Sequence, residues 1–310
     1  MRSRLRHISE MSTQGLNRLK RHIAQKEGVD EACIVFGCGS TAILNTVLER
    51  IAPRKVLTPD PVSQRHRAVL SKYSLECVTV PLKSNEHFEL ATEDFCNAMG
   101  GCDAALLPNP HHVTGTIISP EDIIKIADEA DMLGISLVVD EAYGGYRGTP
   151  SLAGPISNSN GAVILRTFST FHALGGLRLG YMIGPAGFMN HIEAALDPSW
   201  INSLAPWAAI ASMKDKGYHR RTLLFVEEEK AYIRDKVSRI KDAKCYVSPS
   251  NMLVIKLQKE GHVVQKRLGR YKILIHIFAD ENGDTCVRFP VQTHRLNAYF
   301  VRILKRIMEA

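Results

Sequence analysis

The chain has 310 residues, enough for two domains, and its composition is 45% hydrophobic and 23% charged, which excludes a collagen-like chain, a disordered tail and a disulfide-stabilised miniprotein. Its apolar runs are far shorter than the roughly 20 residues that a membrane-spanning helix needs, so we expect no membrane protein. The 39 lysines and arginines exceed the 32 acidic residues by 7, but they are scattered, which favours a solvated surface or a pocket for anionic substrates over nucleic-acid binding.

Short segments with strand character alternate with amphipathic helices over residues 30–185. The clearest helix covers 120–133, where Ser119 is a suitable N-cap, Pro120 fits the first helical position and apolar residues recur at helical spacing. This alternation predicts a mostly parallel sheet with helices on both faces. We predict its strands at 33–36, 55–58, 76–81, 104–107, 136–140, 162–168 and 179–183.

Beyond residue 206 the order of the elements changes. A long charged helix fits 218–240 and a final helix fits 296–308. Four short strands are expected between them, at 244–247, 252–256, 273–277 and 286–289. Because strands and helices are segregated here, we predict a large α/β domain over residues 1–205 and a smaller α+β domain over residues 206–310.

The unusual sequences of the first part follow predicted strands, at the sheet edge where ligands bind in open α/β folds. Gly37-Cys38-Gly39-Ser40-Thr41 leads from one strand into a helix, and glycines with free helix N–H groups suit an anion. Asp140-Glu141-Ala142-Tyr143 ends another strand. Ser169 and Arg178 flank a glycine-rich turn, and a guanidinium beside a hydroxyl suits a phosphate group.

In this order the motifs resemble those of the fold-type I pyridoxal-phosphate (PLP) enzymes of the aminotransferase class I/II family, above all histidinol-phosphate aminotransferase and threonine-phosphate decarboxylase. The resemblance covers residues 10–310, roughly. It includes Val287-Arg288-Phe289 and Asn109-Pro110-His111-His112-Val113-Thr114-Gly115, which stands in place of the family's Asn-Pro-Asn-Asn-Pro-Thr-Gly. It implies a PLP-type large domain with a mainly parallel seven-stranded sheet, a smaller C-terminal α+β domain and a homodimer.

The resemblance also implies roles for the matching residues. Asp140 would pair with the pyridine nitrogen of the cofactor. Tyr143 would hydrogen-bond the ring hydroxyl, and His112 replaces the asparagine that the family has there. Arg288 would bind the substrate carboxylate through two hydrogen bonds. The cofactor phosphate would be held by Gly39, Ser40, Thr41, Ser169 and Arg178.

The lysine that bonds the cofactor in the family is replaced by Thr170. Threonine has no amine to form an imine, to release product or to move the α-proton of the substrate. We therefore expect PLP or pyridoxamine phosphate to bind non-covalently, and standard transamination to be absent or very slow. His172, two residues further on, is a candidate substitute base if it faces the same side as Thr170, and Tyr143 is a further candidate catalytic residue.

Three other departures concern the substrate side of the site. Arg65 stands where the related enzymes have a tyrosine, and His276 takes the place of an arginine that binds the substrate phosphate. The N-terminal arm that closes the active site in the family is expected to be missing. We expect a small amino-acid-like or phosphorylated substrate, bound near Arg65, His276 and Arg288.

Three functions stay open at this point. The first is an ordinary aminotransferase or decarboxylase that uses an unusual base or a distant lysine. The second is an enzyme that uses PLP or pyridoxamine phosphate with His172 or His112 as its base. The third is a non-catalytic descendant that binds a ligand or a partner. An anionic or cofactor ligand is favoured by the retained residues Asp140, Tyr143, Ser169 and Arg178.

The histidines that map near the site do not have the spacing of a metal-binding motif. We expect satisfied polar side chains there and no metal site. The histidines concerned are His111, His112, His172 and His276.

The seven cysteines include no CxxC pair, which favours reduced thiols over disulfides or a zinc ribbon. The basic N-terminus lacks the apolar segment of a secretory signal. Both features lead us to expect a cytoplasmic protein.

Overall fold

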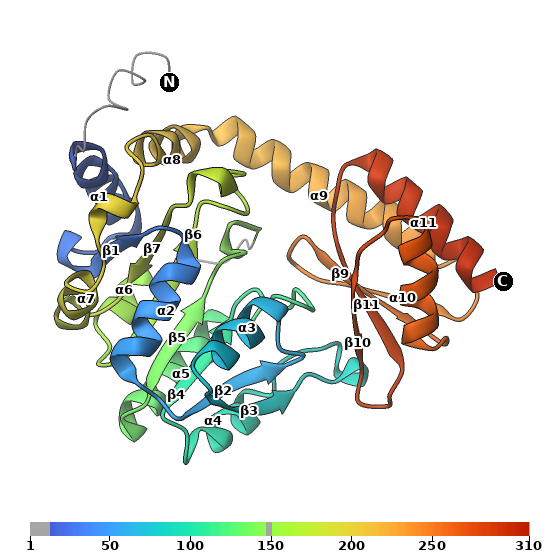
Figure 1. Cartoon of the computed structure of the whole chain (residues 1–310), viewed down its shortest axis with the longest axis horizontal. Coiled ribbons are helices and arrows are strands. Elements are labelled where there is room, and N and C mark those ends of the chain that lie inside the picture. The colour runs from blue at the N-terminus through green and yellow to red at the C-terminus, as the bar shows by residue number, and fades with distance from the viewer. Residues whose placement is uncertain (1–12, 147–150, 310) are drawn as a thin grey trace.

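The larger part of the protein, here called the large lobe, is built on one seven-stranded sheet (Figure 1). The computed structural model describes residues 13–146 and 151–309. The strand order is β1-β7-β6-β5-β4-β2-β3; β7 runs antiparallel to β1 and β6, and the remaining pairs are parallel. The expected mainly parallel sheet is therefore confirmed. Its strands are β1 (Ile34–Gly37), β2 (Lys55–Asp60), β3 (Glu76–Pro81), β4 (Ala104–Pro108), β5 (Ser136–Asp140), β6 (Ala162–Thr167) and β7 (Gly180–Ile183).

Helices cover both faces of this sheet, as its largely apolar strands require. One apolar core joins the sheet to α2, α3 and α7, and a second joins it to α4, α5 and α6. A third cluster packs α1 and α8 against β1 and β7. These helices are α1 (Gln14–Glu27), α2 (Ser40–Ile51), α3 (Gln64–Lys72), α4 (Thr92–Met99), α5 (Pro120–Leu133), α6 (Ala153–Ser157), α7 (Ala186–Glu193) and α8 (Ala205–Lys214).

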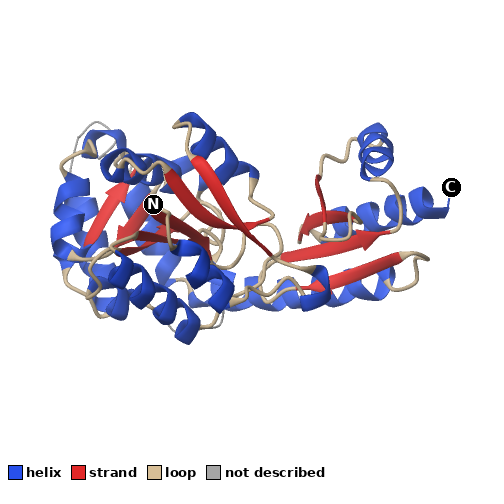
Figure 2. Ribbon diagram, turned by 90° about the horizontal axis from the view of Figure 1, so that it is seen from below, coloured by secondary structure: helices blue, strands red, loops and turns tan. Residues whose placement is uncertain are grey.

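The small lobe is an antiparallel sheet of order β10-β11-β9-β8 that packs on three helices (Figure 2). The long helix α9 leads the chain from the large lobe into it (Figure 1). The predicted boundary between residues 205 and 206 falls at the start of α8, and this domain division stays a prediction. The elements are α9 (Lys216–Val237), β8 (Ala243–Val247), β9 (Met252–Leu257), α10 (Gly261–Arg270), β10 (His276–Ala279), β11 (Thr285–Pro290) and α11 (His294–Glu309).

No helix within the described ranges combines the length and the apolar character that a bilayer crossing requires. Even α9, with 22 residues, carries charged side chains along its length.

The expected elements agree with the structure except at β10. The helix expected at 120–133 is α5, and the Ser119 hydroxyl caps it by accepting a hydrogen bond from the Asp122 backbone N–H. The strand expected at 273–277 is wrong in its position, because β10 begins at His276. Ile273 and Ile275 instead pack against the small-lobe core from an irregular segment. Their alternation therefore reflects packing and not strand pairing.

Candidate ligand-binding site

A cavity of about 320 Å³ lies where the carboxyl ends of the parallel strands meet the small lobe. Its large-lobe walls come from segments that follow β1, β2, β4, β5 and β6, and β10 and β11 close it from the other side. The structure thus brings together residues from distant parts of the sequence. Ten candidate residues line the cavity: Ser40, Thr41, Arg65, His112, Tyr143, Ser169, Thr170, Arg178, His276 and Arg288.

One end of the cavity has the composition of an anion site. Ser40 and Thr41 open α2, whose first backbone N–H groups and positive dipole end favour an anion. Ser169 and Arg178 line the same cavity, and we call these four residues the anion cup. Gly39 precedes the helix at a φ of 86°, and a Cβ atom there would lie 2.6 Å from Nη2 of Arg178. The guanidinium therefore packs directly on the glycine backbone.

Gly180 packs closely against the backbone of Ser40, at the start of α2. A Cβ atom at Gly180 would lie 2.5 Å from the backbone nitrogen of Ser40, which belongs to a helix and cannot simply rotate away. We expect Gly180→Ala to lower the free energy of unfolding by about 1–3 kcal/mol, the usual cost of overpacking. We also expect weaker binding of a phosphorylated ligand. Denaturant unfolding and a binding titration check both effects.

Gly176 provides the matched control, because a Cβ atom there meets no atom within 4 Å. Gly176→Ala should leave ligand binding close to that of the wild type. If Gly180→Ala and Gly176→Ala have the same free energy of unfolding and bind the ligand equally well, the close approach of Gly180 to the start of α2 has no effect on stability or binding, and this prediction is wrong.

Arg65 connects the anion cup to the floor of the cavity. Its Nε donates to the Thr41 hydroxyl at 3.1 Å, and its Nη2 donates to the Ser40 hydroxyl at 3.0 Å. Its Nη1 lies 3.3 Å from Oδ2 of Asp140. The side chain is 27% exposed, so it keeps access to solvent and to an incoming ligand. Arg65 therefore adds a second positive charge beside that of Arg178.

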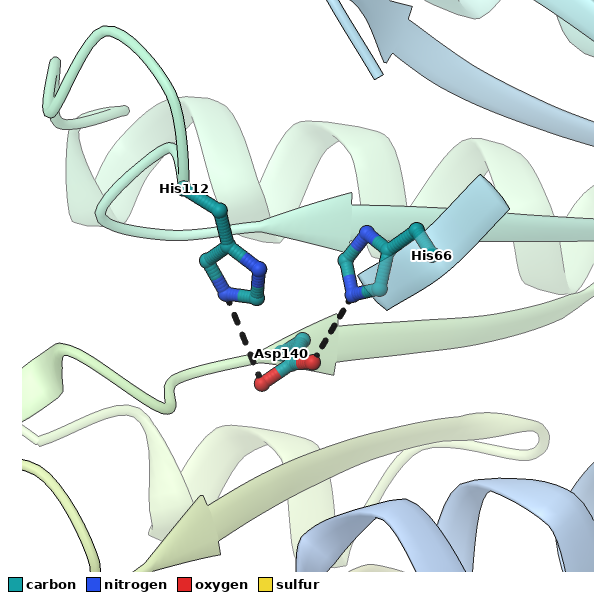
Figure 3. A group of neighbouring side chains, drawn as sticks. All are labelled: His66, His112 and Asp140. Carbon is teal, nitrogen blue, oxygen red and sulfur yellow. Dashed lines mark hydrogen bonds and ion pairs between the residues drawn. The ribbon is translucent and has the colours of Figure 1, made fainter. Parts of the chain in front are cut away.

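Asp140 ends β5 beneath the cavity and is completely buried. Nε2 of His66 lies 2.9 Å from Oδ2 of Asp140, and Nε2 of His112 lies 3.7 Å from its Oδ1 (Figure 3). The backbone N–H of Ala142 donates to Oδ1 at 3.0 Å. Burial alone would raise the pKa of Asp140, but Arg65 and then the two histidines outweigh it and hold this pKa below its usual range. The carboxyl group is therefore ionised at neutral pH.

The histidines of the 109–115 segment are buried and neutral at pH 7. Burial, followed by the nearby charges of His66 and Arg288, lowers the pKa of His111 to about 3. Burial also lowers the pKa of His112 well below its usual value, and Asp140 only partly opposes this shift. Neutral imidazoles retain a lone pair that can accept a proton or bind a metal.

Arg288 reaches into the cavity from β11 of the small lobe. Its Nε donates to the backbone oxygen of His112 at 2.8 Å, and its Nη2 donates to the Tyr143 hydroxyl at 3.2 Å. His276 pairs with it across the sheet, from β10. Burial, then Arg288 and Arg67, lowers the pKa of His276. The small lobe thus contributes one fixed positive charge and one neutral imidazole.

The comparisons with known proteins identify the family of the chain. The family model described as aminotransferase class I and II matches residues 9–300. The chain belongs to the class I/II aminotransferase family. Among its relatives is the histidinol-phosphate aminotransferase of Thermoanaerobacter sp. (strain X514), which is 28% identical over 298 residues, or 94% of this chain and 82% of the relative.

Solved aminotransferase-family structures share the fold. The histidinol-phosphate aminotransferase of Sinorhizobium meliloti, in complex with pyridoxal-5'-phosphate, has a TM-score of 0.88 at 19% identity, covering 99% of this chain and 85% of that one. The L-threonine-O-3-phosphate decarboxylase of Porphyromonas gingivalis has a TM-score of 0.78 at 20% identity, covering 94% and 89%. The resemblance drawn from the motifs and the fold type that it implied are confirmed. The homodimer expected from the same family stays a prediction.

Thr170 stands in the wall of the cavity, in the position that the family resemblance gives to the lysine. Its hydroxyl donates a hydrogen bond to the backbone oxygen of Ala142. None of the described residues that line the cavity is a lysine. The expected absence of a covalent bond to a cofactor stays a prediction.

The expectation that His172 faces the same side as Thr170 does not hold. Residues 168–172 form a bend and a turn instead of a strand, so side chains two residues apart do not share a face. Nδ1 of His172 lies 2.5 Å from the Ser212 hydroxyl, and the ring lines a neighbouring cavity of about 280 Å³. Burial, then nearby cations, lowers the pKa of His172 to about 4. This histidine packs between Phe168 and Phe171 and does not reach the cavity of Thr170.

Sequence reasoning missed His66. It lies in the first turn of α3, next to Arg65, and both side chains point to the carboxylate of Asp140. No motif marks it, because its partner is 74 residues away in the chain. The expected loss of the N-terminal arm stays a prediction, and the residues before α1, 1–12, lie outside the described residues.

Proposed function

We propose that the protein binds pyridoxal phosphate or a related phosphorylated ligand non-covalently in this cavity and does not catalyse standard transamination. The proposal rests chiefly on one observation: Arg178 packs on the start of α2 in the anion cup, and Thr170 lines the same cavity. The family resemblance gives the position of Thr170 to the bonding lysine. Membership of the aminotransferase family supports the choice of ligand.

The residues present fit such a ligand at both ends. The anion cup provides N–H and O–H donors with a guanidinium for a phosphate group. Asp140, ionised beneath the cavity, would hold the protonated ring nitrogen, and Tyr143 and His112 would lie at the ring hydroxyl. When bound, PLP supplies an aldehyde and an electron-withdrawing ring.

Two arginines must exchange partners when the ligand enters. Arg65 now uses the hydroxyls of Ser40 and Thr41, and Arg288 uses the hydroxyl of Tyr143. A phosphate and a carboxylate are the groups for which an arginine gives up neutral partners, since charge-assisted hydrogen bonds are about twice as strong. We infer that the ligand carries both, as a small phosphorylated compound of amino-acid type would.

Thr170 determines what the site does with the ligand. Its hydroxyl is engaged with the backbone of Ala142 and is not basic at neutral pH, so it neither bonds the aldehyde nor moves a proton. His172 does not replace it, because it lines the other cavity. The wall of the site therefore binds and orients a ligand without a general base at the lysine position.

A spectroscopic titration of the purified full-length chain tests the proposal. The visible absorption spectrum of PLP should change when it binds. Dialysis should remove the PLP, and the mass of the protein should stay unchanged after borohydride treatment. Pyridoxal, which lacks the phosphate, should bind much more weakly, because it cannot use the anion cup. A reduced PLP adduct on a lysine, or transamination at ordinary rates, would overturn the proposal.

A further inference from the structure

Two imidazoles and a carboxylate meet at the floor of the cavity (Figure 3). His66 comes from α3, His112 from the loop after β4 and Asp140 from the end of β5. One potential ligand atom of each residue lies within 4.8 Å of the others. His66 and Asp140 are fully buried, and His112 is 4% exposed. This is a side-chain set that divalent transition metals bind.

The hydrogen-bonding state of His112 points to a ligand. Its Nε2 is buried and has no hydrogen-bond partner, although it faces Oδ1 of Asp140. The 3.7 Å between these two atoms is too long for a hydrogen bond. It is close to the separation of about 3.4 Å between two ligand atoms on a tetrahedral metal with bonds near 2.1 Å. A metal ion would give this nitrogen the partner that it lacks.

We propose that His66, His112 and Asp140 form a binding site for a divalent transition-metal ion such as Zn²⁺ or Co²⁺, with an open coordination position toward the cavity. His112 and Arg65 line that cavity, so an ion held between the three side chains would be accessible from it. Three protein ligands and one free position are the arrangement of catalytic, not structural, zinc sites. From the sequence we expected no metal site, because the histidines considered there included His112 but not His66.

His66 must change its tautomer to bind the metal. Its Nε2 lies 2.9 Å from Oδ2 of Asp140 and donates its proton to that carboxylate. A metal ion at Nε2 replaces this hydrogen bond, and the ring then carries its proton on Nδ1, which is buried and has no hydrogen-bond partner.

Arg65 is the group that opposes the metal. Its Nη1 lies 3.3 Å from Oδ2 of Asp140, where a guanidinium repels a second cation. Its other two contacts, to Ser40 and Thr41, do not depend on Asp140. We therefore expect metal binding to release Arg65 from the carboxylate while the arginine stays at the anion cup. Removing its charge should strengthen metal binding.

The inference goes beyond the proposed function, but both use the same carboxylate. A pyridine nitrogen and a metal ion cannot both occupy Asp140, so PLP and the metal should compete. Sulfate, which needs only the anion cup, should not displace the metal. The metal test does not need PLP to bind, so failure of one proposal leaves the other open to its own test.

The experiment is a Co²⁺ titration of the metal-free full-length protein, followed by visible absorption and by metal content after gel filtration. The wild type should develop the absorption bands of Co²⁺ in a nitrogen and oxygen site and retain one equivalent. His112→Asn should weaken Co²⁺ binding by more than about tenfold, since even outer-shell changes cost that much. Arg65→Gln should bind Co²⁺ more tightly than the wild type.

His219→Asn is the control, because this histidine lines the neighbouring cavity and belongs to no part of the cluster. It should bind Co²⁺ as the wild type does. Arg178→Ala, which touches none of the three ligands, should also keep the Co²⁺ bands while it weakens PLP binding. Absence of retained metal in the wild type would overturn the proposal, and so would equal Co²⁺ binding by the His112→Asn and His219→Asn variants.

Discussion

Arg178→Ala is expected to weaken PLP binding by more than roughly tenfold, the loss that follows when a charge-assisted phosphate contact is removed. The guanidinium packs on Gly39 at the start of α2, so it approaches the same anion as the free helix N–H groups. The backbone donors cannot replace its charge. Fluorescence or absorbance titration with PLP gives the dissociation constant for both proteins.

Arg239→Ala controls for the change in net charge, because Arg239 forms an exposed ion pair with Asp235 at the end of α9. It should bind PLP like the wild type. A dissociation constant that Arg178→Ala leaves unchanged would rule out the anion cup as the phosphate site.

Thr170→Lys is expected to create a covalent, borohydride-reducible bond to PLP that the wild type does not form. The position follows Ser169 and lines the same cavity as the anion cup, so an amine there would reach a ligand anchored in the cup. Restoring a base at this position should raise the rate of half-transamination by roughly 10²–10⁴, the usual contribution of general acid–base catalysis. Intact-mass analysis and single-turnover spectra measure the two effects.

Thr170→Met is the matched control, since it has a long side chain without an amine. Both variants lose the hydrogen bond to Ala142, which is worth about 1 kcal/mol, so stability changes cancel in the comparison. If Thr170→Lys binds PLP but forms no covalent bond, the cavity has lost the geometry of its family. If the wild type catalyses transamination at ordinary rates, the activity does not need a lysine at position 170 and this prediction is wrong.

The sheet was predictable because each of its strands is a short apolar segment followed by a helix or a turn. Its seven strands lie within two residues of the expected positions. The strand expected at 273–277 was misplaced because Ile273 and Ile275 have the spacing of a strand but are partly buried by packing on the small-lobe core, without strand pairing. A periodic pattern reports burial, and it does not distinguish a paired strand from an irregular segment.

The cavity was predictable where a residue lies two or three positions beyond the end of a strand, as Ser40, Tyr143 and Ser169 do. The order of such segments fixes which ones meet at the carboxyl edge of the sheet. The direction of a side chain inside a turn is not encoded in this way, and the position of His172 was missed for that reason. The contact of His66 with Asp140 depends on how α3 packs over β5, which the sequence pattern does not specify.

The hydrogen bonds of Arg288 fasten the two lobes together across the cavity. This arginine belongs to the small lobe, and both of its partners, the backbone oxygen of His112 and the hydroxyl of Tyr143, belong to the large lobe. A ligand carboxylate that takes over the guanidinium removes these two contacts, while Ser84 of the large lobe stays hydrogen-bonded to Asp280 and Glu281 of the small lobe. Binding at Arg288 would therefore loosen the contact between the lobes at the cavity and leave it intact at the far side, so the affinity for the carboxylate includes the free energy of the two hydrogen bonds that it replaces.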